Sequence, residues 1–278
     1  MTDKAHDLSA HTDLPLVEAI VAFEPGVMAW TRQHGGDYLA LAEEAVNMFG
    51  IPLQNVRNDC GLFAGALASV RKSAALAFLS GLRNHRVEMA SNLRLLIEST
   101  CLMGYLAAHP DGGPKWKIDD EGRLSKPGDI SKASYKWVGE KYSFLSAPLK
   151  ARKDLLNQGW VHANVANSIV LFNYEAFAAG KGMTSLFDEQ DEQWAQMNMS
   201  DVGNCVVFAL MMLVMVSTEF KVTEMPDGMF DKVQALDVRR VELNDRINKA
   251  LGSNVDGELA GFRTGIAFGV MSSESGRS

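Results

Sequence analysis

Apolar residues recur every three or four positions along most of the chain, which is the spacing of amphipathic helices. The first stripe follows Asp13 and Pro15, an N-cap residue and an early-helix proline, and ends at Pro25-Gly26. The same periodicity predicts helices over residues 37–49, 53–80, 86–108, 131–142, 146–162 and 230–251, with a joint at 81–85. In the last of these helices arginines and acids interleave on the outer side, which is typical of a solvated face.

Two segments interrupt the helical pattern. Residues 109–134 hold three of the eight prolines, and the sequence KWKIDDEGRLS within them indicates a short hairpin turning at residues 120–122. Residues 168–177, SIVLFNYEAF, fit a short strand or an apolar helix equally well, because periodicity does not separate the two. We therefore expect an all-α multi-helix bundle forming a single domain over residues 13–251, with a loop-rich insertion at 109–134 and flexible tails at 1–12 and 272–278.

Residues 202–218 carry no charge and lie between Asp201 and Glu219. Their length is at the lower limit for a membrane-spanning helix, and Gly203 and Asn204 shorten the strongly apolar part. The acids on both sides give no positive-inside asymmetry, which disfavours membrane insertion. A helix that is apolar all round is also typical of the centre of a large helical core. We expect a buried core helix here, with a membrane helix as the alternative.

Composition narrows the class of protein. The chain is 47% hydrophobic and 22% charged with a formal net charge of −7, which excludes global disorder, collagen and a disulfide scaffold and disfavours duplex DNA as a partner. Its N-terminal residues are polar and contain acids, so they do not resemble a secretory signal. The cysteines Cys60, Cys101 and Cys205 are far apart in apolar surroundings, which indicates free thiols in a reducing, cytoplasmic compartment.

Common catalytic and binding motifs are missing from the sequence. Lys181 lies between glycines, but the first glycine and the final Ser or Thr of a phosphate-binding loop are not there. No GxSxG, HExxH or GxGxxG motif occurs, and none of the six histidines has another histidine or a cysteine three or four residues away. The sequence therefore predicts neither a metal nor a cofactor.

Arg94 and Glu98 form the first candidate site. Glu98 is the only formally charged residue between Leu95 and Ala108, so the helix there has no obvious solvent face. A carboxylate in apolar surroundings is paired or has a raised pKa, and Arg94 lies one turn earlier on the same side. The pair is either a polar cluster at a functional site or an ion pair that fixes the register of the helix.

The second candidate site is the segment LLNQGWVHANVANS, in which His162 ends an apolar helix face and Asn164 follows it. A histidine with a pKa near neutrality acts as a general base in many enzymes. A histidine at a helix C-terminus also donates to a backbone carbonyl in a purely structural role. Both interpretations stay open at this point.

The two candidate sites together resemble a known arrangement. A long helix reading R-x-L-x-E (Arg94, Leu96, Glu98) is followed by a VH-x-N turn (Val161, His162, Asn164) and then by a very apolar helix. Over about residues 60–220 this order is similar to a group of bacterial helical proteins of unknown function, considered relatives of the HEPN superfamily (higher eukaryotes and prokaryotes nucleotide-binding). The resemblance implies a helical scaffold and a setting in bacterial stress or phage defence.

The same resemblance implies ribonuclease activity in the catalytic members, where an arginine precedes a histidine by about five residues on one helix. In this chain the nearest upstream arginine is Arg152, ten residues before His162, so the catalytic spacing is not kept. Two functions follow as hypotheses. One is a non-catalytic, self-associating scaffold or regulatory protein that forms homo-oligomers.

The other function is a metal-independent ribonuclease, in which Arg94 stabilises phosphate charge and His162 moves the 2′-hydroxyl proton. In that hypothesis Trp137 and Tyr142 stack on bases, and the RNA backbone follows a run of basic residues, Lys136, Lys141, Lys150, Arg152 and Lys153. The alternative for this run is an ordinary solvated helix face.

Overall fold

The computed structural model describes residues 16–50, 55–113, 120–121, 127–157 and 192–252. Several predictions lie outside these residues: most of the hairpin around residues 114–126, the strand or helix at 168–177, and both tails. His162 and Asn164 also lie outside them.

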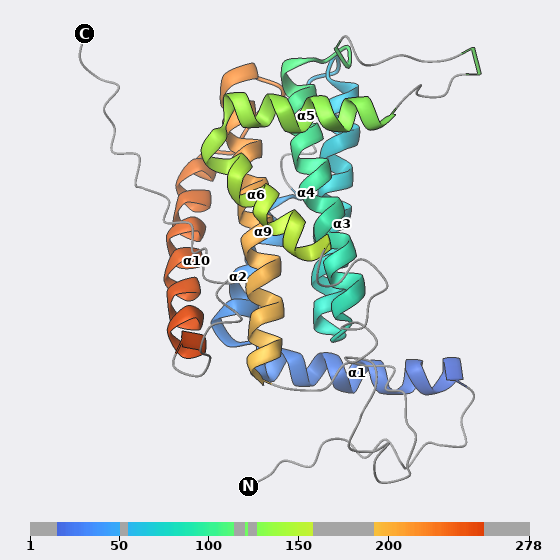
Figure 1. Ribbon diagram of the computed structural model, residues 1–278, viewed down its shortest axis with the longest axis vertical. Coiled ribbons are helices and arrows are strands. Elements are labelled where there is room, and N and C mark those ends of the chain that lie inside the picture. Colours follow the sequence, from blue (N-terminus) through green and yellow to red (C-terminus); the bar gives the residue numbers. More distant parts are fainter. Residues whose placement is uncertain (1–15, 51–54, 114–119, 122–126, 158–191, 253–278) are drawn as a thin grey trace, which may run out of the picture.

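The described residues fold as an all-α bundle, which confirms the predicted fold class. Figure 1 shows the long helices running along the vertical axis, with α1 across one end and α5 across the other. The helices are α1 (Leu16–His34), α2 (Gly36–Met48), α3 (Gly61–Leu82), α4 (Arg86–Ala108), α5 (Pro127–Lys141), α6 (Ser143–Leu156), α9 (Glu192–Phe220) and α10 (Met229–Gly252).

Helix α9 is the centre of the bundle, and α2, α3, α4 and α10 pack around it. Most of its apolar residues between Val202 and Val216 are buried, with Val206, Leu210 and Leu213 at 0% exposure, and Met211 and Met215 are partly exposed. A helix without a polar face is stable in water only when neighbours cover every side, so the sequence of α9 requires this position. The prediction of a core helix over residues 202–218 is confirmed.

Glycines let the neighbouring helices approach closely at two positions. A Cβ atom on Gly81 of α3 would lie 2.7 Å from Met199 Cε of α9. A Cβ atom on Gly104 of α4 would lie 3.1 Å from Met212 Sδ, also of α9. At both positions a flexible methionine fills the space that a missing side chain leaves, so the packing depends on the glycine and the methionine together.

The α3–α4 hairpin turns at the predicted joint. Helix α3 ends at Leu82 and α4 begins at Arg86, with Asn84 between them at φ 55°. Asparagine tolerates this left-handed conformation better than most residues, so the tight connection does not need glycine. The side chain of Asn84 is buried, and its Oδ1 accepts a hydrogen bond of 3.5 Å from Asn198 Nδ2 of α9.

The structure corrects several details of the sequence analysis. Helix α1 continues through Pro25 to His34, and α3 begins at Gly61 and not at residue 53. The insertion is shorter than residues 109–134, because α5 already begins at Pro127. Helix α6 begins at Ser143 and not at residue 146, and it contains Pro148 at its sixth position, where the missing N–H removes one hydrogen bond of the helix. The outer face of α10 is not solvated throughout, because Arg240 is only 3% exposed.

A polar network buries Arg240 between α9 and α10. Asn204 and Asn244 exchange two hydrogen bonds, of 3.0 and 2.7 Å, and Asn204 Oδ1 also accepts a bond from Arg240. The Arg240 guanidinium pairs with Asp237 at 2.7 Å and lies over the ring of Phe208. Because these groups are satisfied only in one alignment, the network fixes the register of the two helices.

Two described helices, α3 and α9, are long and apolar enough to cross a membrane by length and composition. In α9 the neighbouring helices bury 78% of the apolar stretch, as expected for a core helix. In α3 the buried share is 44%, and Arg71 and Lys72 lie exposed in the middle of the helix.

The α4 helix offers a direct test of this packing. Leu93 is fully buried, whereas Leu95, two residues later, is 48% exposed. We expect Leu93→Ala to lower the free energy of unfolding by about 2–5 kcal/mol, because it removes buried methyl groups and leaves a cavity. Leu95→Ala is the matched control, and its effect should stay below about 0.5 kcal/mol. Urea denaturation followed by circular dichroism measures both, and equal effects would contradict the packing of α4.

Candidate functional site

Helix α6 joins three parts of the bundle, because it packs against α4, α5 and α9. Its consecutive residues Arg152 and Lys153 point in directions about 100° apart, as neighbours on a helix do. Lys153 therefore reaches α4, and Arg152 reaches α9. The candidate site consists of the charged groups on these two sides of α6.

The α4 side contains the predicted pair of Arg94 and Glu98. Arg94 Nε lies 3.3 Å from Glu98 Oε1, and Lys153 Nζ lies 2.9 Å from the same oxygen. Side-chain exposures of 33% for Arg94, 31% for Glu98 and 20% for Lys153 place the cluster at the edge of the core. The Glu98 carboxylate thus binds two cations, of which the sequence analysis had identified Arg94.

Tyr135 of α5 completes this cluster. Lys153 Nζ lies 4.3 Å from the centroid of the Tyr135 ring, which is a cation–π contact. Burial, with the negative groups nearby, raises the pKa of the Tyr135 hydroxyl, so that hydroxyl stays protonated. Burial also raises the pKa of the neighbouring Cys101 thiol to about 12. Neither group is therefore poised as a nucleophile or base near neutral pH.

The α9 side of α6 is more deeply buried. Arg152 forms an ion pair with Asp201, with side-chain exposures of 18% and 22%. Burial lowers the pKa of Arg152, and the nearby Cys205 thiol opposes this effect. Burial raises the pKa of Cys205, with Arg152 as the opposing influence. A guanidinium keeps its charge at any physiological pH, so Asp201 and Arg152 form a permanent link between α9 and α6.

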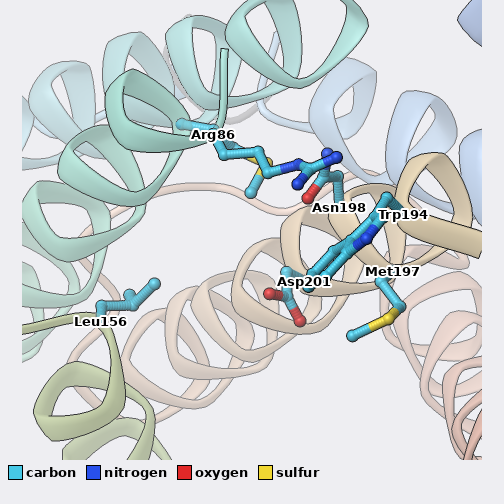
Figure 2. Close-up of a pocket in the computed structure, with 7 residues that line it drawn as sticks. Arg86, Leu156, Trp194, Met197, Asn198 and Asp201 are labelled. Atoms are coloured by element: carbon cyan, nitrogen blue, oxygen red, sulfur yellow. The ribbon is translucent and has the colours of Figure 1, made fainter. Parts of the chain in front are cut away.

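A small cavity lies beside this link, and Figure 2 shows Arg86 of α4 reaching across it toward Asn198 and Trp194 of α9. The Arg86 guanidinium stacks 4.3 Å from the centroid of the Trp194 ring. The cavity volume is about 20 Å³, which is room for one water molecule. Its walls come from the three helices around it, through Arg86, Met89, Leu156, Trp194, Met197, Asn198 and Asp201.

The sequence analysis missed this cavity. Arg86 is the first residue of α4 and is only 5% exposed, although an arginine at the start of a helix is usually solvated. Its burial depends on Trp194, which is more than a hundred residues away in the sequence. The spacing of residues within one helix cannot predict a contact between residues so far apart in the sequence. Asp201 was visible only as the charge that borders the apolar stretch 202–218.

The structure brings together Arg94 and Glu98 among the predicted site residues. It does not place His162 or Asn164, which lie outside the described residues. The distance between Arg94 and His162, on which the ribonuclease hypothesis depends, therefore stays a prediction. Within the described ranges, no group of three or more histidines, cysteines or acids is arranged to hold a metal ion.

The predicted RNA-binding run is largely committed to contacts within the chain. Lys136 pairs with Glu140 at 3.8 Å, and Lys141 pairs with Glu219 at 2.5 Å. Arg152 and Lys153 pair with acids on α9 and α4, as described above. Lys150 is exposed, and no ion pair is found for it among the described residues.

The aromatic residues expected to stack on bases are also part of the core. Trp137 packs against the rings of Tyr105, Tyr142 and Phe220. Tyr142 is 5% exposed, and its hydroxyl donates a 2.6 Å hydrogen bond to Glu219. The buried position explains the raised pKa of the Tyr142 hydroxyl, to which the Glu219 carboxylate contributes.

Comparison with known protein families, with curated proteins and with solved structures finds no match for this chain. The geometry of the described residues is therefore the basis for the function proposed below.

Lys153 offers a test of the cluster with a neighbour as control. We expect Lys153→Met to lower the free energy of unfolding by about 1 kcal/mol, because it removes a partly exposed ion pair and a cation–π contact. Lys150→Met, on the exposed side of the same helix, should change it by less than about 0.5 kcal/mol. Urea denaturation measures both. Equal effects would mean that Lys153 is a surface charge without a structural role.

The cysteines offer a second test of the site, because Cys60, Cys101 and Cys205 are free and at most 1% exposed. Burial raises the pKa of all three thiols. We expect the native protein to react with a thiol reagent only very slowly at about pH 8, and all three thiols to react once the chain is unfolded. A stoichiometric thiol reaction of the native protein would contradict the burial of α4 and α9.

Proposed function

We propose that this chain is a non-catalytic helical scaffold or regulatory protein that self-associates. The observation that carries the proposal is that the charged groups of the candidate site pair with one another and join helices. Glu98 is held by Arg94 and Lys153, and Arg152 is held by Asp201. A general acid or base needs a free proton-transfer position facing a substrate, and these pairs occupy that position.

The size of this one cavity limits what it could bind. Small-molecule sites have volumes of roughly 300–1,000 Å³, whereas the cavity beside Arg86 and Asp201 measures about 20 Å³. A metabolite does not fit there without movement of α4 or α9. The polar groups around it act as links between helices in this proposal.

Self-association is supported by the large apolar side chains that remain in contact with solvent. Such side chains lie on several described helices, including Leu76, Leu95 and Trp194, and the most exposed are on α1 and α10, where Val17 is 69%, Val21 64%, Phe230 63% and Val238 55% exposed. Single exposed apolar residues are common on proteins, whereas neighbouring ones such as Val17 and Val21, one helical turn apart, form a surface that a second molecule can cover. We place this scaffold or regulatory function in bacterial stress or phage defence, as the HEPN resemblance implies.

Light scattering coupled to gel filtration tests self-association. We expect the purified full chain to run as a dimer or larger oligomer at micromolar concentration and to dissociate on dilution. A monomer at every concentration up to the highest attainable would contradict the proposal.

The same preparation tests the absence of catalysis against the ribonuclease alternative. We expect wild-type protein and the His162→Ala variant to leave a mixed RNA pool equally intact in the presence of a chelator. Cleavage by the wild-type protein that His162→Ala abolishes would establish the ribonuclease instead. Equal cleavage by both preparations would point to a contaminating nuclease, which repurification removes before the comparison is repeated.

A further inference from the structure

Helix α1 lies across one end of the bundle, and among the described helices it packs against α2, α3 and α9 (Figure 1). Val27 and Thr31 on the inner side are buried, at 6% and 1% exposure, against the ends of α2, α3 and α9. The inner side also carries the half-buried Ile20, Phe23 and Trp30. The inward stripe of α1 is therefore already covered, and a separate stripe faces outward.

The outward stripe of α1 is apolar although it is in solvent. A rotation of about 100° per residue places Val17, Val21, Pro25 and Ala29 along one line, with Ala22 beside it. All five residues are exposed, Val17 and Val21 to 69% and 64%. We call this set of five residues the outer stripe.

Charge is found at the two ends of the outer stripe and not along it. Glu18 lies at its N-terminal end and Arg32 at its C-terminal end, and both are exposed. Arg32 pairs with Glu43 of α2 at 3.3 Å, and its side chain keeps 48% exposure, so a second acid can still reach it. Between Glu18 and Arg32 the only charged residue of α1 is Glu24, which is turned away and pairs with Arg83 at 2.5 Å. The outer stripe thus has an acid at one end and a base at the other.

This arrangement is complementary to itself when two copies of α1 run in opposite directions. With Pro25 facing Pro25 of a second copy, Glu18 lies opposite Arg32 of that copy at both ends, and Val21 lies opposite Ala29. Within one helix, Glu18 and Arg32 are about 21 Å apart along the axis. The small side chains of Ala22, Pro25 and Ala29 allow the two helices to approach closely. Such a contact is isologous and closes as a dimer.

Other occupants fit the outer stripe less well. A parallel pair of α1 helices places like charges together at each end, which is unfavourable. Helices that lie on membranes carry several lysines or arginines beside the apolar face, and the exposed side of α1 has Arg32 alone. The balanced charges of α1 favour a second copy over an anionic surface.

We propose that the outer stripe of α1 is the self-association surface of this protein and pairs antiparallel with the same stripe of a second copy, centred at Pro25. This inference rests on the proposed self-associating function and names the surface that carries it. One helix pair is smaller than the roughly 800 Å² per partner of a standard interface, so we expect a weak dimer that dissociates on dilution.

Sedimentation equilibrium with two exposed-valine variants tests the surface. Val21→Glu places a charge within the outer stripe and should raise the dimer dissociation constant by about tenfold or more. Val238→Glu makes the same change at an exposed valine of α10 and should leave the constant within about twofold of the wild-type value. Circular dichroism checks that both variants are folded.

Disulfide cross-linking tests the direction and centre of the pairing. The native cysteines are buried, so an introduced thiol on α1 is the reactive one. Pro25→Cys should form a covalent dimer on mild oxidation, because residue 25 faces its own copy across the axis. Val17→Cys is the control and should not, because its own copy lies about 24 Å away along the helix. Cross-linking of Val17→Cys but not of Pro25→Cys would overturn the antiparallel arrangement.

The outcomes separate this inference from the function on which it rests. A monomeric wild-type protein contradicts the proposed function and the inference together. A wild-type dimer that Val21→Glu leaves intact contradicts the inference alone, and loss of that dimer in Val238→Glu moves the interface to α10. A monomer that binds neutral phosphatidylcholine vesicles through Val21 makes the outer stripe a membrane contact and also overturns the inference.

Discussion

The burial of α9 is the constraint on which the rest of this fold depends. Its residues from Cys205 to Val216 are apolar on every side, and each large side chain removed from water contributes roughly 1.5–3 kcal/mol. Such a helix needs neighbours all around it, so α2, α3, α4 and α10 form a ring and not a flat layer. Helices α1, α5 and α6 then cover the ends and one side of that ring.

The polar residues of α9 define how each neighbour is placed. Asn204 meets Asn244 of α10, Asp201 meets Arg152 of α6, and Asn198 meets Asn84 before α4. Apolar packing tolerates small slips along a helix, whereas a buried polar group left without its partner costs about 1–3 kcal/mol. The apolar surface therefore drives the assembly, and these three polar positions select one arrangement of it.

Much of the fold was predictable because its signals are local. The period of apolar residues in α4 identified residues 86–108 from the sequence, and the joint before it is visible in residues 83–85. The start of α6 was missed because a proline usually marks the first turn of a helix, whereas Pro148 lies inside the helix that begins at Ser143. The burial of Arg240 was missed because interleaved charges do not tell which of them faces a neighbouring helix.

The candidate site also has one part that could be predicted from the sequence and another part that could not. Arg94 and Glu98 are four residues apart on one helix, so their ion pair could be predicted from spacing alone. Lys153, Tyr135, Trp194 and Arg86 join their partners through tertiary contacts between helices, and no sequence spacing encodes these contacts. From the sequence, Lys153 was considered either for RNA binding or as part of a solvated face, and its ion pair with Glu98 was not predicted.

The glycine–methionine contacts on α9 have a consequence for how this chain can diverge. At Gly81 with Met199, and at Gly104 with Met212, the fit belongs to a pair of residues on two helices. A larger residue in place of either glycine needs a shorter one in place of its methionine, so a single change is penalised where a double change is tolerated. Distant relatives should therefore differ at these positions in matched pairs. Such paired variation identifies common descent even where the individual residues are no longer alike.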